Sequence, residues 1–431
     1  MTAVAPPAQT APAAPALTTP QVLKLGLVAI CLASMLMMGA AITGARSHLH
    51  AMQAIGKDSA PSIIAAEHMR AALADMDAEA ANELLTGGGD AAFEKRRTEA
   101  VLGIVEAAKN LKYGEAELQK LALGVGTYTA GIQTSRDKRA AGDKGYLAPW
   151  RQATRFMDSV VLKAGADLDA ANRTELDQAY AEQKTASVRA LVLLLAGAAV
   201  AGGVLIAMQV FVAGRMRRIL NPGLAAATLA TVVFLIYAGQ RFAENDRYLK
   251  VAKEEAFESI HALWQARAVA YAANSDESRY LLDVGQVAPS QAAKYEADFQ
   301  AKAAQVDGFL DAEMKNITFV GEGEPAREAV ANFAAYRKID RQIRDLEKSG
   351  KHEAAIALCT GNAPGQSDYA FGKFDDALGR TLQVNQEAFD AAVHQGLGDV
   401  DGFDVTAPVA AFLIAVLGWA GLGPRIREYS V

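Results

Sequence analysis

The chain alternates between long apolar runs and long polar segments with helical periodicity. Four runs contain no charged residue: 25–45, 190–214, 224–239 and 405–423. Three of them reach the length of about 20 residues that a helix needs to cross a bilayer. We therefore expect membrane-spanning helices at 21–45, 190–213, 223–239 and 405–423.

The third span is the shortest, with 16 residues before Gln240. Asn221 and Pro222 precede it, and this pair is typical of an N-cap followed by the first turn of a helix. The span can therefore begin at the level of the lipid headgroups.

Short basic segments predict the orientation in the membrane. The loop 214–222 carries three arginines and no acid, and the tail 424–431 carries two arginines and one acid. Basic residues in short loops stay in the cytosol, whereas long domains cross regardless of charge. We expect a multi-pass protein of the cell membrane with both termini in the cytosol, including an Ala/Pro-rich disordered tail at 1–20. The segments 46–189 and 240–404 then lie outside.

Both outer segments have the composition and periodicity of helices almost throughout. The first predicts helices at 63–85, 93–111, 116–138 and 146–187, and glycine-rich breaks divide the second in a similar way. In each segment the last helix runs directly into a membrane span. The expected fold class is an all-α membrane protein with four transmembrane helices and two tandem extracytoplasmic four-helix bundles.

Several matches suggest that the second half repeats the first. Tyr128 matches Tyr336 at an offset of 208 residues, and Asn172 matches Asn385 at an offset of 213. Arg-x-Arg follows both the second and the fourth span. We predict a tandem duplication in which the two tyrosines are core positions with hydroxyls at a bundle edge.

Composition restricts the chemistry. Segment 240–404 carries 18 Lys/Arg and 28 Asp/Glu, a net charge of −10, which argues against nucleic acid as a ligand. Cys31 lies in the first span and Cys359 in the second outer segment, so they cannot pair, and we expect Cys359 to be a buried, inert thiol. Signatures of nucleophilic, metal or nucleotide sites do not occur, which predicts a protein that is not an enzyme and has no cofactor or metal.

Two arginines hold similar places on the first outer helix of each half. Arg70 and Arg267 are the candidates for holding an acidic ligand bidentately. The alternative is an ion pair within the helix, such as Arg70 with Glu67 three residues before it.

The second span carries small residues at four-residue spacing, Ala198 with Gly202 and Ala199 with Gly203. This spacing favours close helix contact in a bilayer. The contact lies either within the chain or between two chains of a homodimer.

The arginines at the cytosolic exits have two interpretations. They serve as topology and headgroup anchors, or they contact a cytosolic partner. In the second interpretation, the contact is made by the arginines of both exits, together with Glu428 and Tyr429 of the tail.

Four spans, two outer bundles, an Arg-rich N-P-G hairpin and the C-terminal P-R-I-R-E-Y resemble the actinobacterial GlnX family. The resemblance implies a non-enzymatic relay that passes amino-acid availability, sensed by an extracytoplasmic solute-binding lipoprotein, to a cytosolic serine/threonine kinase. The residues that match the family's cytosolic pattern, and that the resemblance implies for the kinase contact, are Arg215, Arg217, Arg218, Asn221, Pro222, Gly223, Arg425, Arg427, Glu428 and Tyr429. The outer bundles resemble chemoreceptor-like sensors as well, and this leaves a direct small-molecule receptor or a structural envelope scaffold as alternatives.

Overall fold

The computed structural model describes residues 18–109, 114–216, 220–284 and 289–428. These residues form helices joined by turns and bends, and no strand occurs among them. The predicted all-α class is therefore confirmed. The predicted tail at 1–20 lies almost wholly outside the described residues.

The chain divides into two compact units, which we call the apolar unit and the polar unit. The apolar unit consists of Met1–His48, Thr185–Glu244 and Asp399–Val431. The polar unit consists of Leu49–Lys184 and Asn245–Gly398. Residues from both halves of the sequence therefore meet in each unit.

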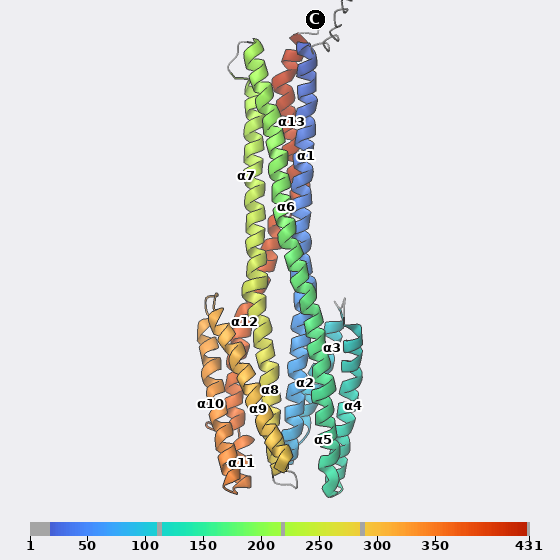
Figure 1. The fold of residues 1–431 in the computed structure, drawn as a ribbon, viewed down its shortest axis with the longest axis vertical. Helices are drawn as coiled ribbons and strands as arrows, with labels where there is room; N and C mark the ends of the chain where they lie inside the picture. The colour runs from blue at the N-terminus through green and yellow to red at the C-terminus, as the bar shows by residue number, and fades with distance from the viewer. Residues whose placement is uncertain (1–17, 110–113, 217–219, 285–288, 429–431) are drawn as a thin grey trace, which may run out of the picture. The chain divides into compact units, whose positions relative to one another are not determined.

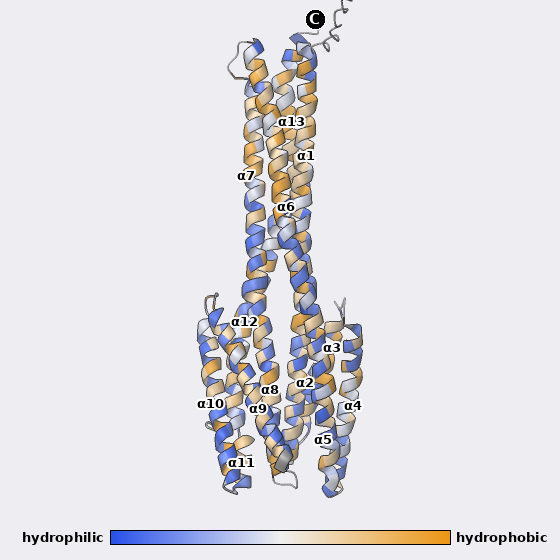
Figure 2. Ribbon diagram, viewed as in Figure 1, coloured by the Kyte–Doolittle hydropathy of each residue, from blue (hydrophilic) through white to orange (hydrophobic). Residues whose placement is uncertain are grey.

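The apolar unit contains the four apolar runs. They lie on α1 (Thr19–Gln53), α6 (Leu162–Met216), α7 (Pro222–Lys250) and α13 (Phe403–Glu428). Four helical stretches are long and apolar enough to cross a membrane: Thr19–Thr86, Lys144–Arg215, Pro222–Val284 and Ser367–Glu428. Figure 2 shows the hydrophobic residues along these helices. Many large apolar side chains, Phe412 and Val210 among them, are exposed, as residues that face lipid are.

Helices α7 and α13 approach each other closely at one end of the apolar unit. A Cβ atom on Gly223 would lie 2.6 Å from the Cα of Gly421. The side chain of Asn221 accepts hydrogen bonds from the backbone N–H of Gly223 (3.1 Å) and Leu224 (3.3 Å) and donates one to the carbonyl oxygen of Gly421 (2.8 Å). Asn221 is thus the N-cap that the sequence predicts, and it also fastens α7 to α13.

The small residues of α6 make a different contact from the predicted one. A Cβ atom on Gly202 or Gly203 would meet nothing within 4 Å, whereas one on Gly197 would lie 3.1 Å from the Cα of Met37 in α1. A close approach within the chain is therefore centred on Gly197, because this glycine faces α1. A contact between two chains at Gly202 and Gly203 stays a prediction.

The polar unit is built from helices of both halves (Figure 1). The first half supplies α2 (Ala60–Thr86), α3 (Ala91–Lys109), α4 (Glu115–Ala140), α5 (Leu147–Phe156) and the first part of α6. The second half supplies α8 (Glu258–Val284), α9 (Pro289–Lys315), α10 (Gly323–Lys348), α11 (His352–Cys359) and α12 (Ser367–Val400). Short π-helical segments precede α2 (η1, Ala54–Ser59), α6 (η3, Met157–Val161) and α8 (η4, Val251–Phe257).

The two halves share one packing interface in the polar unit, since α2 packs along α8. One continuous core holds Ile63 and Leu176 of the first half together with Phe257, Leu263 and Phe374 of the second. The two halves therefore pack against each other, while a second core lies almost wholly within the first half. The division into two four-helix bundles stays a prediction. Burial of apolar side chains from both halves in a common core stabilises their association.

Both repeated tyrosines are fully buried. The hydroxyl of Tyr128 donates a hydrogen bond to the carboxylate of Asp77 (2.9 Å), and the Tyr336 ring packs against Phe299 and Phe333. The prediction that the hydroxyls lie at a bundle edge was wrong, because both point into the interior. The tandem duplication itself stays a prediction.

Helix continuity differs between the connections. Helix α6 runs without interruption for 55 residues and has residues in both units. Helices α12 and α13 are instead separated by a turn at Asp401 and Gly402, and Gly402 adopts a φ of +84°. A glycine suits this left-handed conformation because it has no Cβ atom.

Candidate functional site

Arg70 lies on α2 and is paired within its own helix. Its guanidinium donates to the carboxylate of Glu67, three residues earlier. This is the intrahelical ion pair that the sequence offered as the alternative to ligand binding. The Nε atom of Arg70 is buried and has no hydrogen-bond partner among the described residues, so the pair does not use the whole guanidinium.

Glu67 is completely buried. Burial raises its pKa to about 7, and the positive charge of Arg70 offsets part of this rise. Near neutral pH the carboxyl group is therefore partly protonated. It lies beside Asp169 and His261, whose side chains are also buried.

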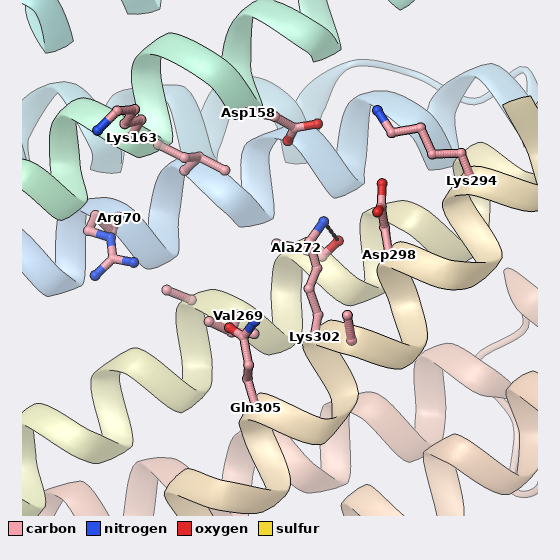
Figure 3. A pocket seen from close by; sticks show the side chains of 12 residues that line it. Arg70, Asp158, Lys163, Val269, Ala272, Lys294, Asp298, Lys302 and Gln305 are labelled. Carbon is pink, nitrogen blue, oxygen red and sulfur yellow. Dashed lines mark hydrogen bonds between the residues drawn. The ribbon is translucent and has the colours of Figure 1, made fainter.

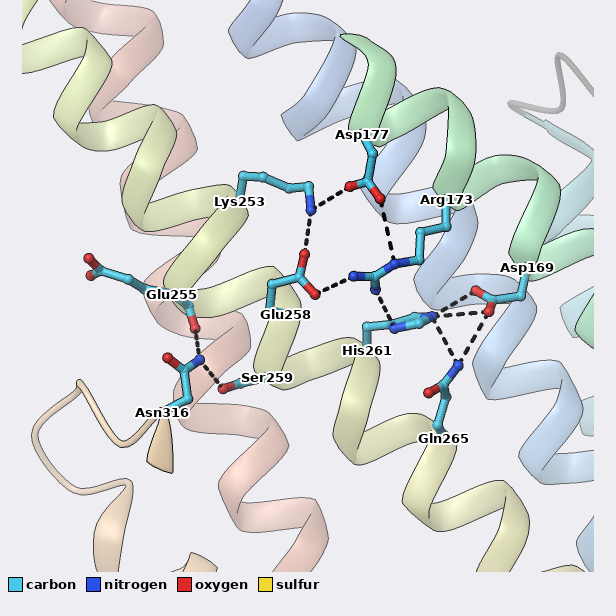
Figure 4. Close-up of polar contacts among 10 residues, drawn as sticks. All are labelled: Asp169, Arg173, Asp177, Lys253, Glu255, Glu258, Ser259, His261, Gln265 and Asn316. Atoms are coloured by element: carbon cyan, nitrogen blue, oxygen red, sulfur yellow. Dashed lines mark hydrogen bonds and ion pairs between the residues drawn. The ribbon is translucent and has the colours of Figure 1, made fainter. Parts of the chain in front are cut away.

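His261 on α8 connects the two halves of the chain (Figure 4). Arg173 on α6 contacts its Nδ1 atom at 2.7 Å, and Asp169 on α6 contacts its Nε2 atom at 2.9 Å. A guanidinium is always protonated and can only donate. The Nδ1 atom must therefore accept, and the Nε2–H must donate to Asp169, which fixes the tautomer of a neutral imidazole.

The same network extends along α6 towards η4. The guanidinium of Arg173 binds Glu258 at 2.5 Å, and the ammonium of Lys253 binds Asp177 at 2.8 Å as well as Glu258. Lysine and arginine of opposite halves thus bind acids across the α6–α8 contact.

Glu67, Asp169 and His261 have the chemistry of a metal site, since their ligand atoms lie within 4.8 Å of one another. Two observations oppose this function. The Arg173 contact leaves the hydrogen on Nε2, whereas a metal needs an unprotonated nitrogen. The guanidinium of Arg70 also lies against the Glu67 carboxylate and already supplies it with a positive partner. We interpret the cluster as a network of hydrogen bonds and ion pairs.

Arg267, the second predicted ligand residue, lies in different surroundings. Its guanidinium binds Asp375 on α12 at 2.5 Å and lies over the Trp264 ring, 5.1 Å from the centroid. It lines a cavity of only about 50 Å³, too small for an organic ligand. The structure therefore does not bring Arg70 and Arg267 together into one site.

A second buried charge cluster surrounds Arg279 of α8, whose side chain is 1% exposed. Its guanidinium binds Asp77 of α2, Asp158 of η3 (2.9 Å) and Asp276 of its own helix (3.1 Å). Ser275 also donates to Asp77 (2.5 Å). Arg279 therefore ties α8 to two elements of the first half.

A cavity of about 540 Å³ opens beside this cluster (Figure 3). Arg70 and Asp158 line it from the first half, and Lys294, Asp298 and Lys302 from the second. Its volume lies within the range of known ligand sites, about 300–1,000 Å³.

The predicted cytosolic contact residues fall into three groups. Arg217, Arg218 and Tyr429 lie outside the described residues. Arg215, Pro222, Arg427 and Glu428 are exposed, and Arg425 binds Glu428 at 2.5 Å. Asn221 and Gly223 are instead engaged in the α7–α13 contact described above. Their packing role accounts for both residues without a partner protein.

The pKa of Glu67 predicts a specific pH dependence of stability. In the folded protein the pKa of Glu67 is about 7, above the ordinary value of 4.5. Between these two pH values the folded protein keeps a proton on Glu67 that the unfolded chain has released. The resulting stabilisation is complete below about pH 4.5 and is lost as the pH rises through about 7. The unfolding free energy of the wild type should fall between pH 5 and 8, and Glu67→Gln should make this fall smaller by about 2 kcal/mol. Thermal unfolding of the detergent-solubilised chain at several pH values measures this slope.

The exposed Glu106 provides the matched control, because Glu106→Gln alters no buried carboxyl group. It should leave the slope at the wild-type value. A Glu67→Gln chain with that same slope would contradict the assigned protonation of Glu67.

Comparison with known proteins places a sensor domain in the first half. Residues 51–181 match the family model of the actinobacterial sensor domain. The match covers α2 to α5 and the beginning of α6, and it includes Glu67, Arg70 and Asp169. No curated protein and no solved structure matches the chain. Together with the four helices of membrane-spanning length, the match supports a membrane sensor protein of actinobacterial type.

Proposed function

We propose that the chain is a non-enzymatic transmembrane relay, which couples extracytoplasmic sensing of amino acids to a cytosolic serine/threonine kinase. A solute-binding lipoprotein would deliver the amino-acid signal to the polar unit. The kinase would read it at the arginine-bearing ends of the apolar unit. The chain would lie in the cell membrane with both termini in the cytosol.

One observation carries the proposal. The matched sensor domain ends at residue 181, inside helix α6, and this helix continues without a break to Met216. The last helix of the sensor domain is thus also a candidate membrane span, and it leads to the arginine-rich segment. A continuous helix can transmit a small axial or rotational shift as a rigid body.

The described residues at the cytosolic ends suit the output step. Arg215 and Arg427 are exposed, and a guanidinium binds carboxylates and phosphates through two parallel hydrogen bonds. In the proposed relay, a soluble partner reads the signal at these arginines. A pull-down with and without amino acids tests the input step, because the relay requires amino-acid-dependent capture of the lipoprotein.

Replacing Arg425 and Arg427 together with glutamine tests the output. The three arginines of the loop 214–222 remain and preserve the positive-inside signal. We expect kinase capture to fall about tenfold or more, since each charge-assisted contact contributes about 1.5–3 kcal/mol. Co-purification of the kinase and phosphorylation of its substrate measure the effect.

Arg46→Gln is the matched control, because Arg46 is exposed and pairs with Asp404 away from these ends. It should leave capture unchanged. If the Arg425/Arg427 variant reaches the membrane at normal levels and still gives a normal kinase response, these ends do not carry the output. An unchanged response in chains lacking all five arginines would reject the relay in favour of the envelope scaffold.

A further inference from the structure

We propose that the cavity of about 540 Å³ in the polar unit binds a small organic acid through its carboxylate group. The cavity is formed by both halves of the chain: α2, η3 and α6 contribute from the first, and α8 and α9 from the second. The inference rests on the proposed sensor function and adds a ligand that the chain itself recognises.

The charges that line the cavity favour an anion. The lining has four basic groups, Arg70, Lys163, Lys294 and Lys302, and two acids, Asp158 and Asp298. Lys163 is paired with Asp167 of its own helix at 2.9 Å. The excess of basic groups contrasts with the strongly acidic second half that supplies two of them. Basic groups that line a cavity attract small anions and raise their local concentration.

Arg70 is placed to bind a carboxylate. Its side chain lines the cavity (Figure 3), and its buried Nε atom has no partner among the described residues. Gly165 on α6 makes room for the side chain, because a Cβ atom there would lie 2.6 Å from the Cγ of Arg70. The partner Glu67 is partly protonated near neutral pH and so neutralises only part of the positive charge.

The opposite wall is supplied by α9. Lys302 binds the buried Asp276 at 2.5 Å and donates to the carbonyl of Ala272 at 3.3 Å, so its position is fixed. Within the described residues, neither Lys294 nor Asp298 makes an ion pair. Lys294 is therefore the basic group of α9 that is available to a ligand. Asp298 can accept a hydrogen bond from the same ligand.

The remaining lining is apolar and suits a short carbon skeleton. Leu162 and Val269 come from opposite halves, and alanines of α8 and α9 lie between them. Arg70 of α2 and Lys294 of α9 both line the cavity, so a ligand bound there lies between the two halves of the chain. Since α6 forms another wall and continues into the apolar unit, the site is connected to the helix that carries the proposed relay.

Binding to the full-length chain in detergent micelles or nanodiscs tests the site. Isothermal titration with L-glutamate, succinate and inorganic phosphate is the measurement. We expect saturable binding of L-glutamate or succinate at one molecule per chain, with a Kd below about 1 mM. Lys294→Gln should weaken this binding about tenfold, as loss of one charge-assisted contact does.

A paired variant and a control complete the experiment. Arg70→Gln with Glu67→Gln removes the cationic end without leaving a buried charge unpaired, and it should weaken binding at least as much as Lys294→Gln. Lys120→Gln on α4 alters an exposed lysine outside the cavity and should bind like the wild type. Because titration needs no partner protein, its result is independent of whether the kinase relay operates.

The proposal is overturned if neither acid binds saturably up to about 10 mM, or if both cavity variants bind like the wild type. Phosphate binding as tight as that of the acids would overturn the carboxylate assignment. A chain that binds as expected while kinase output fails to respond would reject the relay and leave the ligand site standing.

Discussion

Replacing Arg279 with methionine is expected to lower the unfolding free energy of the polar unit by about 3–5 kcal/mol. Methionine fills much of the same volume but leaves the carboxylates of Asp77 and Asp276 without their common cation. The side chains of both acids are almost completely buried, at 3% and 0% exposure. Removing one partner of a buried ion pair costs far more than the pair contributes, because the remaining charge is left desolvated.

The pH dependence provides an independent check on this loss. Burial already raises the pKa of Asp77 and of Asp276, and Arg279 lowers both in part. Without the arginine, both pKa values should rise further. The folded variant can then relieve the uncompensated charge by taking up protons, so its deficit should shrink as the pH falls from about 8 to 5. Thermal unfolding across this range measures the change.

Arg380→Met is the matched control. Arg380 pairs with Glu328, and both side chains are about half exposed, so its removal should cost less than about 1 kcal/mol. Equal losses in the Arg279 and Arg380 variants would show that the buried cluster does not stabilise the contact of α8 with α2 and η3.

The second large effect is expected from Gly223→Leu in the apolar unit. A Cβ atom at this position meets backbone atoms of α13, including the Cα of Gly421 at 2.6 Å and the carbonyl oxygen of Leu417 at 2.8 Å. Backbone atoms cannot turn away as side chains do, so α7 must move from α13 and Asn221 must lose its bond to Gly421. We expect a loss of about 1–3 kcal/mol or more, measured as a lower unfolding temperature in detergent.

Gly239→Leu on the same helix provides the control, because a Cβ atom at Gly239 meets nothing within 4 Å. Its effect should stay within about 0.5 kcal/mol. If the two leucine variants unfold at the same temperature, α7 and α13 do not pack as closely as the structure has them. If the proposed kinase partner responded less to the Gly223 variant alone, this contact would be linked to the proposed output.

Local sequence patterns predicted much of the fold. Uninterrupted apolar runs are sufficient to locate membrane-length helices, since no soluble helix needs them. The N-cap at Asn221 and the ion pair of Glu67 with Arg70 were also predictable, because their partners lie within four residues. Burial of Cys359 is confirmed. It follows the general tendency of free cysteines to be buried.

The buried charge clusters around His261 and Arg279 were not predictable from local sequence patterns. His261 and Asp169 lie 92 residues apart, and Arg279 and Asp77 lie 202 residues apart. On a helix with many charges, a buried aspartate cannot be distinguished by its neighbours in sequence from an exposed one. Which charges are buried depends on the packing of α2 along α8, and the chain offers no local signal for that pairing. The only sequence hint was the similar placement of Arg70 and Arg267, and their surroundings turned out to differ.

The packing of α2 along α8 has a consequence for signalling in the cell. Both partners of this interface belong to one polypeptide, so they are present at a high effective concentration that does not change when the protein is diluted. In a receptor assembled from separate subunits, low expression would favour dissociation and reduce the response of each molecule. Here the α2–α8 interface should form in every molecule, however few copies a cell holds.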